Sequence, residues 1–265
     1  MKFQRVIVFT LIFSSLLGCS SRSGELIPTT KLEQVASIPS SPKVATTPNT
    51  SDTPPAFAPE STSYAFPTSI DPTKQYLFYL HGKIIEDQGI PAISPEFGEY
   101  QYEAILEKLS SFGFVVISEQ RPENTDGVAY ARKTVQHMMD LLDAGVPAAN
   151  ITVVGASKGA GIVIYASHFL ENDEVNYVIM AICHPDVLAD LKRDQIFLRG
   201  NVLSIYDSAD AWAGSCQELF SISKSKGLSS YNEVVLHVGT GHGILYQPLD
   251  EWILPAVQWA NSRHP

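Results

Sequence analysis

Basic residues are scarce in this chain of 265 residues. Lys and Arg number 18 against 28 Asp and Glu, which gives a formal net charge of −10. Binding to nucleic acid requires clustered Lys and Arg at the phosphates, so this balance argues against a nucleic-acid partner. Cysteine is scarcer, and three residues are too few for a disulfide framework. The composition, 45% hydrophobic and 17% charged, excludes collagen-like, fully disordered and heptad-repeat proteins.

The chain also lacks an apolar run long enough to cross a membrane comfortably. The run at 6–17 follows Lys2 and Arg5, and its length is typical of the apolar region of a secretory signal. It leads, through two leucines and a glycine, to Cys19, an ending that resembles the bacterial lipobox. The resemblance implies that 1–18 is a lipoprotein signal peptide and that the acylated Cys19 anchors the protein to membrane lipid. The alternative is an ordinary signal with an incidental cysteine.

The segment 19–68 is rich in Ser, Thr and Pro and holds eight of the 17 prolines. Without sustained apolar periodicity it cannot bury enough surface to offset its ordering entropy, so we expect a disordered tether. A folded domain is expected at 69–265. In a Gram-negative cell, Ser20 after the cysteine indicates, by the lipoprotein resemblance, the periplasmic side of the outer membrane.

The domain alternates apolar strands with helical patterns. Strands are predicted at 76–80, 114–117, 151–154, 177–183, 202–206 and 233–238, and helices at 100–112, 130–144, 159–170 and 248–261. Such alternation predicts an α/β fold with a mostly parallel sheet flanked by helices. Ligands of these sheets bind at the carboxyl ends of the strands, where we therefore look for chemistry.

The strand at 151–154 leads into Gly155-Ala156-Ser157-Lys158-Gly159 and then into a helix. This is the GxSxG nucleophile elbow in its required strand–turn–helix context. Side chains at the two glycines would collide with neighbouring backbone, and the sharp turn lifts the Ser157 hydroxyl out of the sheet. The turn also places the Lys158 N–H at a helix start, where it can bind an oxyanion.

His81-Gly82 follows the strand at 76–80 and resembles the oxyanion loop of α/β-hydrolases. The N–H of Gly82 or of Lys83 would be the second oxyanion donor, and His81 is expected to be structural. Asp207 and Asp210 follow the strand at 202–206.

His242 lies between glycines after the strand at 233–238. The chain order is thus Ser, Asp, His, as this fold uses it. His242 can take the serine proton, and an aspartate can fix the ring's tautomer.

On these motifs the domain resembles the α/β-hydrolase superfamily, as a small esterase-like serine hydrolase. The resemblance implies acyl-enzyme chemistry on carboxylic esters or thioesters, small or polymer-attached, with Ser157, Asp210 and His242 as the catalytic triad and without metal or organic cofactor. The segment between the strand ending near Cys183 and the one starting near Asn201 is too short for a large lid domain. Alternatives are a lidless peptidase or acyltransferase with the same triad, or a non-catalytic envelope lipoprotein.

The identity of the acid is open. Asp210 stands where the family usually places it, Asp207 is expected to be a turn residue, and Asp186 competes because some members place the acid after the preceding strand. Cys183 and Cys216 lie near neighbouring strand ends and are predicted to form a disulfide that pins the acid loop, the alternative being two buried thiols.

Charged residues gather near the predicted strand ends: Glu86, Asp87, Glu119, Arg121 and Lys158. We interpret them as an ion-pair network that braces the oxyanion loop and the elbow, with recognition of a polar substrate as the alternative.

Overall fold

The computed structural model describes residues 64–264. The signal peptide and Cys19 lie outside the described residues, as does nearly all of the tether. Tyr64 and Phe66 precede the domain start expected at 69, yet both pack partly buried against the hydrophobic core. The N–H of Ser118 also donates to the Tyr64 carbonyl at 2.7 Å, which ties this segment to the domain.

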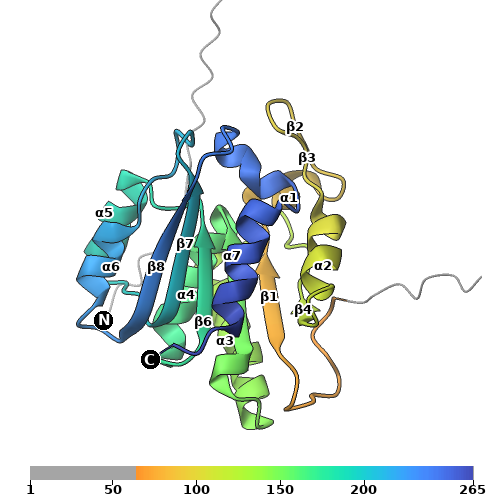
Figure 1. The fold of residues 1–265 in the computed structure, drawn as a ribbon, viewed down its shortest axis with the longest axis vertical. Helices are drawn as coiled ribbons and strands as arrows, with labels where there is room; N and C mark the ends of the chain where they lie inside the picture. Colours follow the sequence, from red (N-terminus) through yellow and green to blue (C-terminus); the bar gives the residue numbers. More distant parts are fainter. Residues whose placement is uncertain (1–63, 265) are drawn as a thin grey trace, which may run out of the picture. The chain divides into compact units, whose positions relative to one another are not determined.

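One sheet organises the domain, and all its strand pairs are parallel. The strand order is β4-β1-β5-β6-β7-β8. The strands are β1 (Tyr76–Leu80), β4 (Val115–Ile117), β5 (Ile151–Ala156), β6 (Asn176–Met180), β7 (Gly200–Asp207) and β8 (Leu228–Leu236). A separate antiparallel pair consists of β2 (Ile93–Ser94) and β3 (Gly98–Glu99). In Figure 1 the strands of the main sheet run upward, so that their carboxyl ends share the upper edge.

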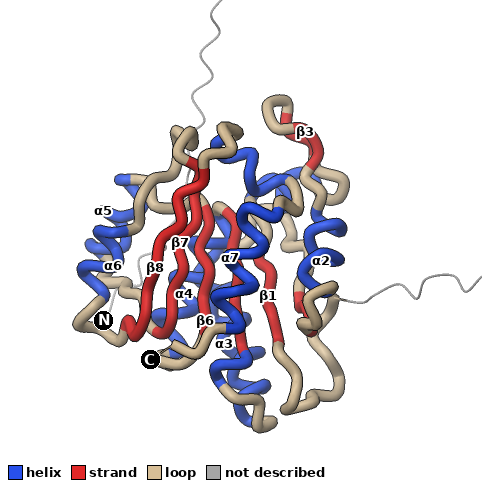
Figure 2. Tube along the Cα trace, in the orientation of Figure 1, coloured by secondary structure: helices blue, strands red, loops and turns tan. Residues whose placement is uncertain are grey.

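Helices cover both faces of the sheet (Figures 1 and 2). One face packs against α3 (Gly127–Asp143), α4 (Lys158–Leu170), α5 (Pro185–Arg193) and α6 (Gln217–Ser223). The other face packs against α1 (Lys83–Gln88), α2 (Tyr102–Ser110) and α7 (Asp250–Asn261). Residues 64–264 also contain two short 3₁₀ helices, η1 (Ala148–Asn150) and η2 (Gly241–Tyr246).

Alternation along each strand divides the core between these faces. In β1, Tyr76 and Phe78 join the cluster under α3 and α4, whereas Leu77 and Tyr79 join the cluster under α2 and α7. Successive strand side chains point to opposite faces, so a strand buried on both faces must be apolar throughout, as β1 is. The predicted fold class, a mostly parallel sheet flanked by helices, is confirmed.

The connection between β6 and β7 holds only α5 and its flanking turns, so the expected absence of a large lid domain there is confirmed. The sequence patterns missed α5 and α6, which are short. They also missed α1 and the hairpin formed by β2 and β3. The α3 helix starts at Gly127 instead of residue 130 because the Asp126 carboxylate accepts the N–H groups of Val128 and Ala129 at 2.9 Å.

Candidate active site

The turn at Ser157 has a conformation that few residues adopt. Its φ is 51° and its ψ is −116°, a strained region for a residue with a side chain. The two glycines of the elbow are required by space. A Cβ at Gly155 would lie 2.5 Å from the Gly159 carbonyl oxygen, and a Cβ at Gly159 would lie 1.9 Å from the Leu80 carbonyl oxygen. The expectation that side chains here would collide with backbone is confirmed.

Backbone hydrogen bonds fix this turn at the sheet edge. The Ser157 N–H donates to the Met180 carbonyl of β6 at 3.0 Å, and the Ser157 carbonyl accepts from Ala160 at 2.9 Å and from Gly161 at 3.2 Å. Lys158 is the first residue of α4, where a backbone N–H has no carbonyl of its own helix to bind. That N–H is therefore placed to bind an anionic oxygen beside the serine.

The β1–α1 loop lies against the elbow. A Cβ built at Gly82 would lie 3.8 Å from the Ser157 Cβ and equally far from the Ala156 carbonyl oxygen. The Tyr100 ring lies equally close to that Cβ, and its hydroxyl shares a 2.6 Å hydrogen bond with the Tyr79 hydroxyl. Lys83 is the first residue of α1, so its N–H has no carbonyl of its own helix to bind, and the N–H groups of Gly82 and Lys83 both remain candidate donors.

The predicted base and the predicted acid are paired. His242 is the second residue of η2, and its Nδ1 donates to the Asp210 Oδ2 at 2.8 Å. The Asp210 carboxylate is 0% exposed, and its Oδ1 accepts the N–H groups of Trp212 at 2.8 Å and Ala213 at 3.2 Å. Burial by itself would raise the pKa of Asp210, but these hydrogen bonds and the imidazole outweigh it and lower that pKa. Asp210 is therefore an ionised carboxylate that holds the Nδ1 side of the His242 ring, and the ring's Nε2 takes no part in this contact.

Asp207 binds the backbone of both loops that carry this pair. It is fully buried, its Oδ1 accepts the Ala209 N–H at 2.8 Å, and its Oδ2 accepts those of Val238 and Gly239 at 2.8 and 2.9 Å. The sequence suggested only a turn residue. The structural role is wider, because one carboxylate joins the acid loop after β7 to the base loop after β8.

Asp186, the alternative acid, lies elsewhere. Its side chain is 93% exposed at the start of α5, where its Oδ2 lies 3.6 Å from the His184 Nδ1. The structure thus brings together Asp210 and His242 and leaves Asp186 on the surface.

Cys183 and Cys216 form a disulfide in the structure, with Cα atoms 5.3 Å apart. Cys183 also pairs through its backbone with Gly214 as an isolated β-bridge. Glu233 of β8 accepts the Cys216 N–H at 2.6 Å and the Ser215 hydroxyl at 2.6 Å. The acid loop is therefore bound at its far end to the β6–α5 connection and to β8.

His81 is buried and neutral beneath the oxyanion loop. Its Nδ1 donates to the Gly82 carbonyl at 2.8 Å, and its Nε2 accepts the Arg121 N–H at 2.9 Å. Because Nε2 is already an acceptor, protonation would break that bond. Desolvation, and then the Arg121 charge, lower the His81 pKa from 6.5 to about 3. The expectation that His81 is structural agrees with this arrangement.

We predict that His81 makes the domain sensitive to acid. Between pH 6.5 and 3 the unfolded chain binds a proton at this histidine and the native state does not, so stability falls as the pH falls. The loss attributable to His81 should be on the order of 2 kcal/mol between pH 7.5 and 5. Urea unfolding at both pH values should show a smaller drop for His81→Gln than for the wild type, whatever its stability at pH 7.5. The matched control is His237→Gln at the surface, and equal drops in all three proteins would contradict the prediction.

A cavity of about 190 Å³ opens beside the Asp210–His242 pair. Its walls come from the β2–β3 hairpin, the acid loop and the base loop, and include Glu96, Phe97 and Trp212. Phe97 packs on the Tyr246 ring at 5.2 Å between centroids, and a Cβ at Gly243 would lie 2.9 Å from it. No sequence pattern points to Phe97, because the strands on either side of it have two residues each and are too short for a periodic pattern.

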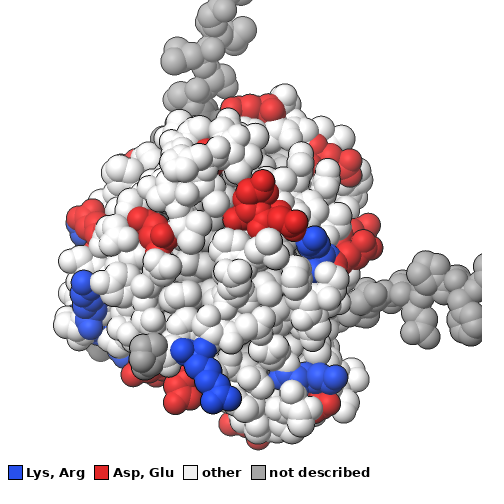
Figure 3. All heavy atoms as spheres, viewed as in Figure 1, with Lys and Arg blue, Asp and Glu red and all other residues white. Residues whose placement is uncertain are grey.

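Within residues 64–264, no group of three or more His, Cys, Asp or Glu side chains is placed to bind a metal ion. In the same residues no helix is long and apolar enough to cross a membrane. On the face drawn in Figure 3, Lys and Arg are few and separated, and they form no continuous basic patch.

Comparisons with known proteins give structural likeness only. No protein-family model and no curated protein matches this sequence. Among solved structures, SOBER1 of Arabidopsis thaliana is 10% identical, with a TM-score of 0.47 over 71% of this chain and 97% of that chain. A predicted CIB-like hydrolase from Thermoplasma acidophilum is 18% identical, with a TM-score of 0.45 over 73% and 90%. The Bacillus cereus carboxylesterase is 16% identical, with a TM-score of 0.45 over 72% and 89%. At these values the chemistry of this chain has to be inferred from its own side chains.

Proposed function

We propose that this protein is a serine hydrolase that cleaves carboxylic ester or thioester bonds through an acyl-enzyme. The observation that carries the proposal is the strained Ser157, held between two glycines that have no room for a side chain, at the same sheet edge as the bonded Asp210–His242 pair. Strain of this kind persists where the surroundings fix it, and it is concentrated at functional sites.

In the proposed reaction, the Ser157 Oγ attacks the acyl carbon while His242 Nε2 takes its proton. The carbonyl electron pair moves to the oxygen, which the N–H group of Lys158 and that of Gly82 or Lys83 bind as an oxyanion. Collapse of this intermediate breaks the bond to the alcohol or thiol, which leaves with the proton from His242. Water then attacks the acyl-enzyme by the same route and releases the acid. Asp210 keeps the Nδ1 proton on its side of the ring and stabilises the imidazolium.

The cavity beside His242 supports a substrate with a small group on that side. Residues of the β2–β3 hairpin line it together with the loops after β7 and β8, and no lid domain follows β6. Small soluble esters and acyl groups attached to a polymer are both compatible with such access, whereas interfacial opening of a lid has no counterpart here.

The test is labelling with a fluorophosphonate, which forms a bond to an activated serine and loses fluoride. We expect one adduct per chain, on the peptide that contains Ser157, together with hydrolysis of short-chain p-nitrophenyl esters. Absence of labelling in protein that is folded by circular dichroism would refute the proposed function.

We also propose that the hydrolase acts at the cell envelope, anchored through an acylated Cys19. The lipobox-like sequence at 16–19 supports this, and the residue lies outside the described part of the chain. Labelled palmitate should enter the wild-type protein in the bacterial cell, and Cys19→Ser should abolish both this incorporation and recovery in the membrane fraction. Membrane recovery that survives in Cys19→Ser would contradict the anchor, and Ser20→Ala is the matched control.

A further inference from the structure

A single buried carboxylate joins the two loops that flank Ser157. Glu86 of α1 has a side chain that is 1% exposed. Its Oε1 accepts the Arg121 Nε at 2.7 Å, and its Oε2 accepts the Lys158 Nζ. Both oxygens are therefore used, and each contacts a cation from a different part of the chain.

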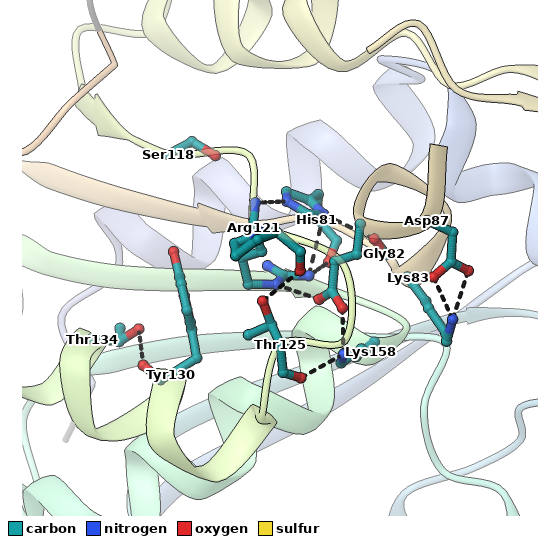
Figure 4. Close-up of polar contacts among 12 residues, drawn as sticks. His81, Gly82, Lys83, Asp87, Ser118, Arg121, Thr125, Tyr130, Thr134 and Lys158 are labelled. Carbon is teal, nitrogen blue, oxygen red and sulfur yellow. Dashed lines mark hydrogen bonds and ion pairs between the residues drawn. The ribbon is translucent and has the colours of Figure 1, made fainter. Parts of the chain in front are cut away.

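The two cations continue the connection on either side. Arg121, which is 0% exposed, donates through Nη2 to the His81 carbonyl and through its backbone N–H to the His81 ring. Lys158 also donates to the Thr125 carbonyl at 2.8 Å. Figure 4 shows Arg121, His81 and Lys158 converging between the β1–α1 loop and the start of α4. The cluster thus contacts the β1–α1 loop, the start of α4 and the loop that precedes α3.

These contacts bear directly on the oxyanion donors. The Lys83 N–H stands three residues before Glu86 in α1, and the Lys158 N–H belongs to the residue whose side chain Glu86 binds. A buried ion pair is a weak source of net stability, because desolvation offsets most of its Coulomb energy. The contribution of this ion pair is to fix the position of the β1–α1 loop relative to the start of α4.

We infer that Glu86 is a positioning residue, which holds the oxyanion loop and the nucleophile elbow at the separation that lets both N–H groups bind the same oxygen. The inference rests on the proposed function. Glu86 does not touch the substrate. Its effect is exerted through the positions of two backbone donors, so its loss should weaken binding of the transition state far more than binding of the substrate.

The first test compares Glu86→Gln with Asp250→Asn, which removes an exposed carboxylate of α7 that pairs with Lys108 of α2 at 3.0 Å. For Glu86→Gln, kcat for a p-nitrophenyl ester should fall roughly 10- to 100-fold with KM within about threefold, a range set by the loss of one oxyanion donor. Asp250→Asn should stay within about twofold of the wild type. A merely structural loss would lower the fraction of active molecules and leave kcat per active molecule unchanged.

The second measurement uses a trifluoromethyl ketone, whose carbonyl carbon bonds to the serine oxygen while its own oxygen becomes anionic. Its affinity should fall in Glu86→Gln by the same factor as kcat. If Glu86→Gln does not fold, Lys158→Met removes the contacts of the ammonium with Glu86 and with the Thr125 carbonyl and keeps the backbone N–H, and the same loss is expected. Folded variants with kcat within threefold of the wild type would overturn the inference.

Amide hydrogen exchange separates this inference from the proposed function. If Glu86 joins the two loops, Glu86→Gln or Lys158→Met should speed exchange in both 81–88 and 157–161, and Asp250→Asn in neither. This readout does not depend on catalysis, so it applies even if the wild type hydrolyses nothing. Faster exchange in only one loop, or in neither, would overturn the inference.

Discussion

Replacing Ser157 by alanine should reduce kcat for short-chain esters by about 10⁶-fold and abolish fluorophosphonate labelling. The reason is that no other group can form the acyl-enzyme, so only the oxyanion donors and binding contribute to what remains. The alanine keeps the Cβ, and the strained backbone of the turn is fixed by its neighbours, so the fold should be unchanged. Steady-state kinetics and intact-protein mass spectrometry measure both outcomes.

Two further variants make this result specific. His242→Ala should cost a similar factor, because a serine at its ordinary pKa is a poor nucleophile without an adjacent base. Ser111→Ala, which alters an exposed hydroxyl at the end of α2, should behave as the wild type. Turnover that survives in Ser157→Ala would end the proposed mechanism, whatever the labelling pattern.

Asp210→Asn is the second large effect, with an expected loss of kcat on the order of 10⁴-fold. The carboxylate accepts the Nδ1 proton of His242 and two backbone N–H groups. An amide in its place can present an N–H toward Nδ1 and so favour the tautomer that has its proton on Nε2. That tautomer cannot accept the serine proton. Turnover measured at several pH values should remain low throughout, because raising the pH does not move the ring proton from Nε2 to Nδ1.

Asp186→Asn provides the matched control. Its carboxylate is almost entirely exposed on α5, so the change should leave kcat within about twofold of the wild type. A larger loss for Asp186→Asn than for Asp210→Asn would transfer the role of the acid to residue 186. A 10⁴-fold loss with both variants folded and Asp186→Asn active would fix it at Asp210.

The nucleophile turn could be predicted because its constraints are local. Gly155, Ser157 and Gly159 lie within five residues, and the distances that exclude a Cβ there involve the turn itself and the adjacent β1. The sheet could also be predicted, because strands buried on both faces are apolar at every position and differ in this pattern from the helices. Residues at the carboxyl ends of those strands then had to share one edge.

The identity of the acid and its supports could not be predicted in the same way. Asp207 and Asp210 both follow β7, and only the course of the turn shows that one binds backbone while the other meets His242. The Glu86 contacts join residues 35 and 72 positions apart, which no local pattern encodes. The β2–β3 hairpin was missed because two-residue strands carry no alternation.

The double attachment of Asp207 has a consequence for motion in the site. Because one carboxylate binds the backbone on both sides, the imidazole and its acid can travel as a rigid couple, and their mutual bond need not open when either loop shifts. If the cleft widens during product release in the proposed reaction, the distance between the Asp210–His242 pair and the turn at Ser157 would change. The proton acceptor would return to the serine already in its working tautomer.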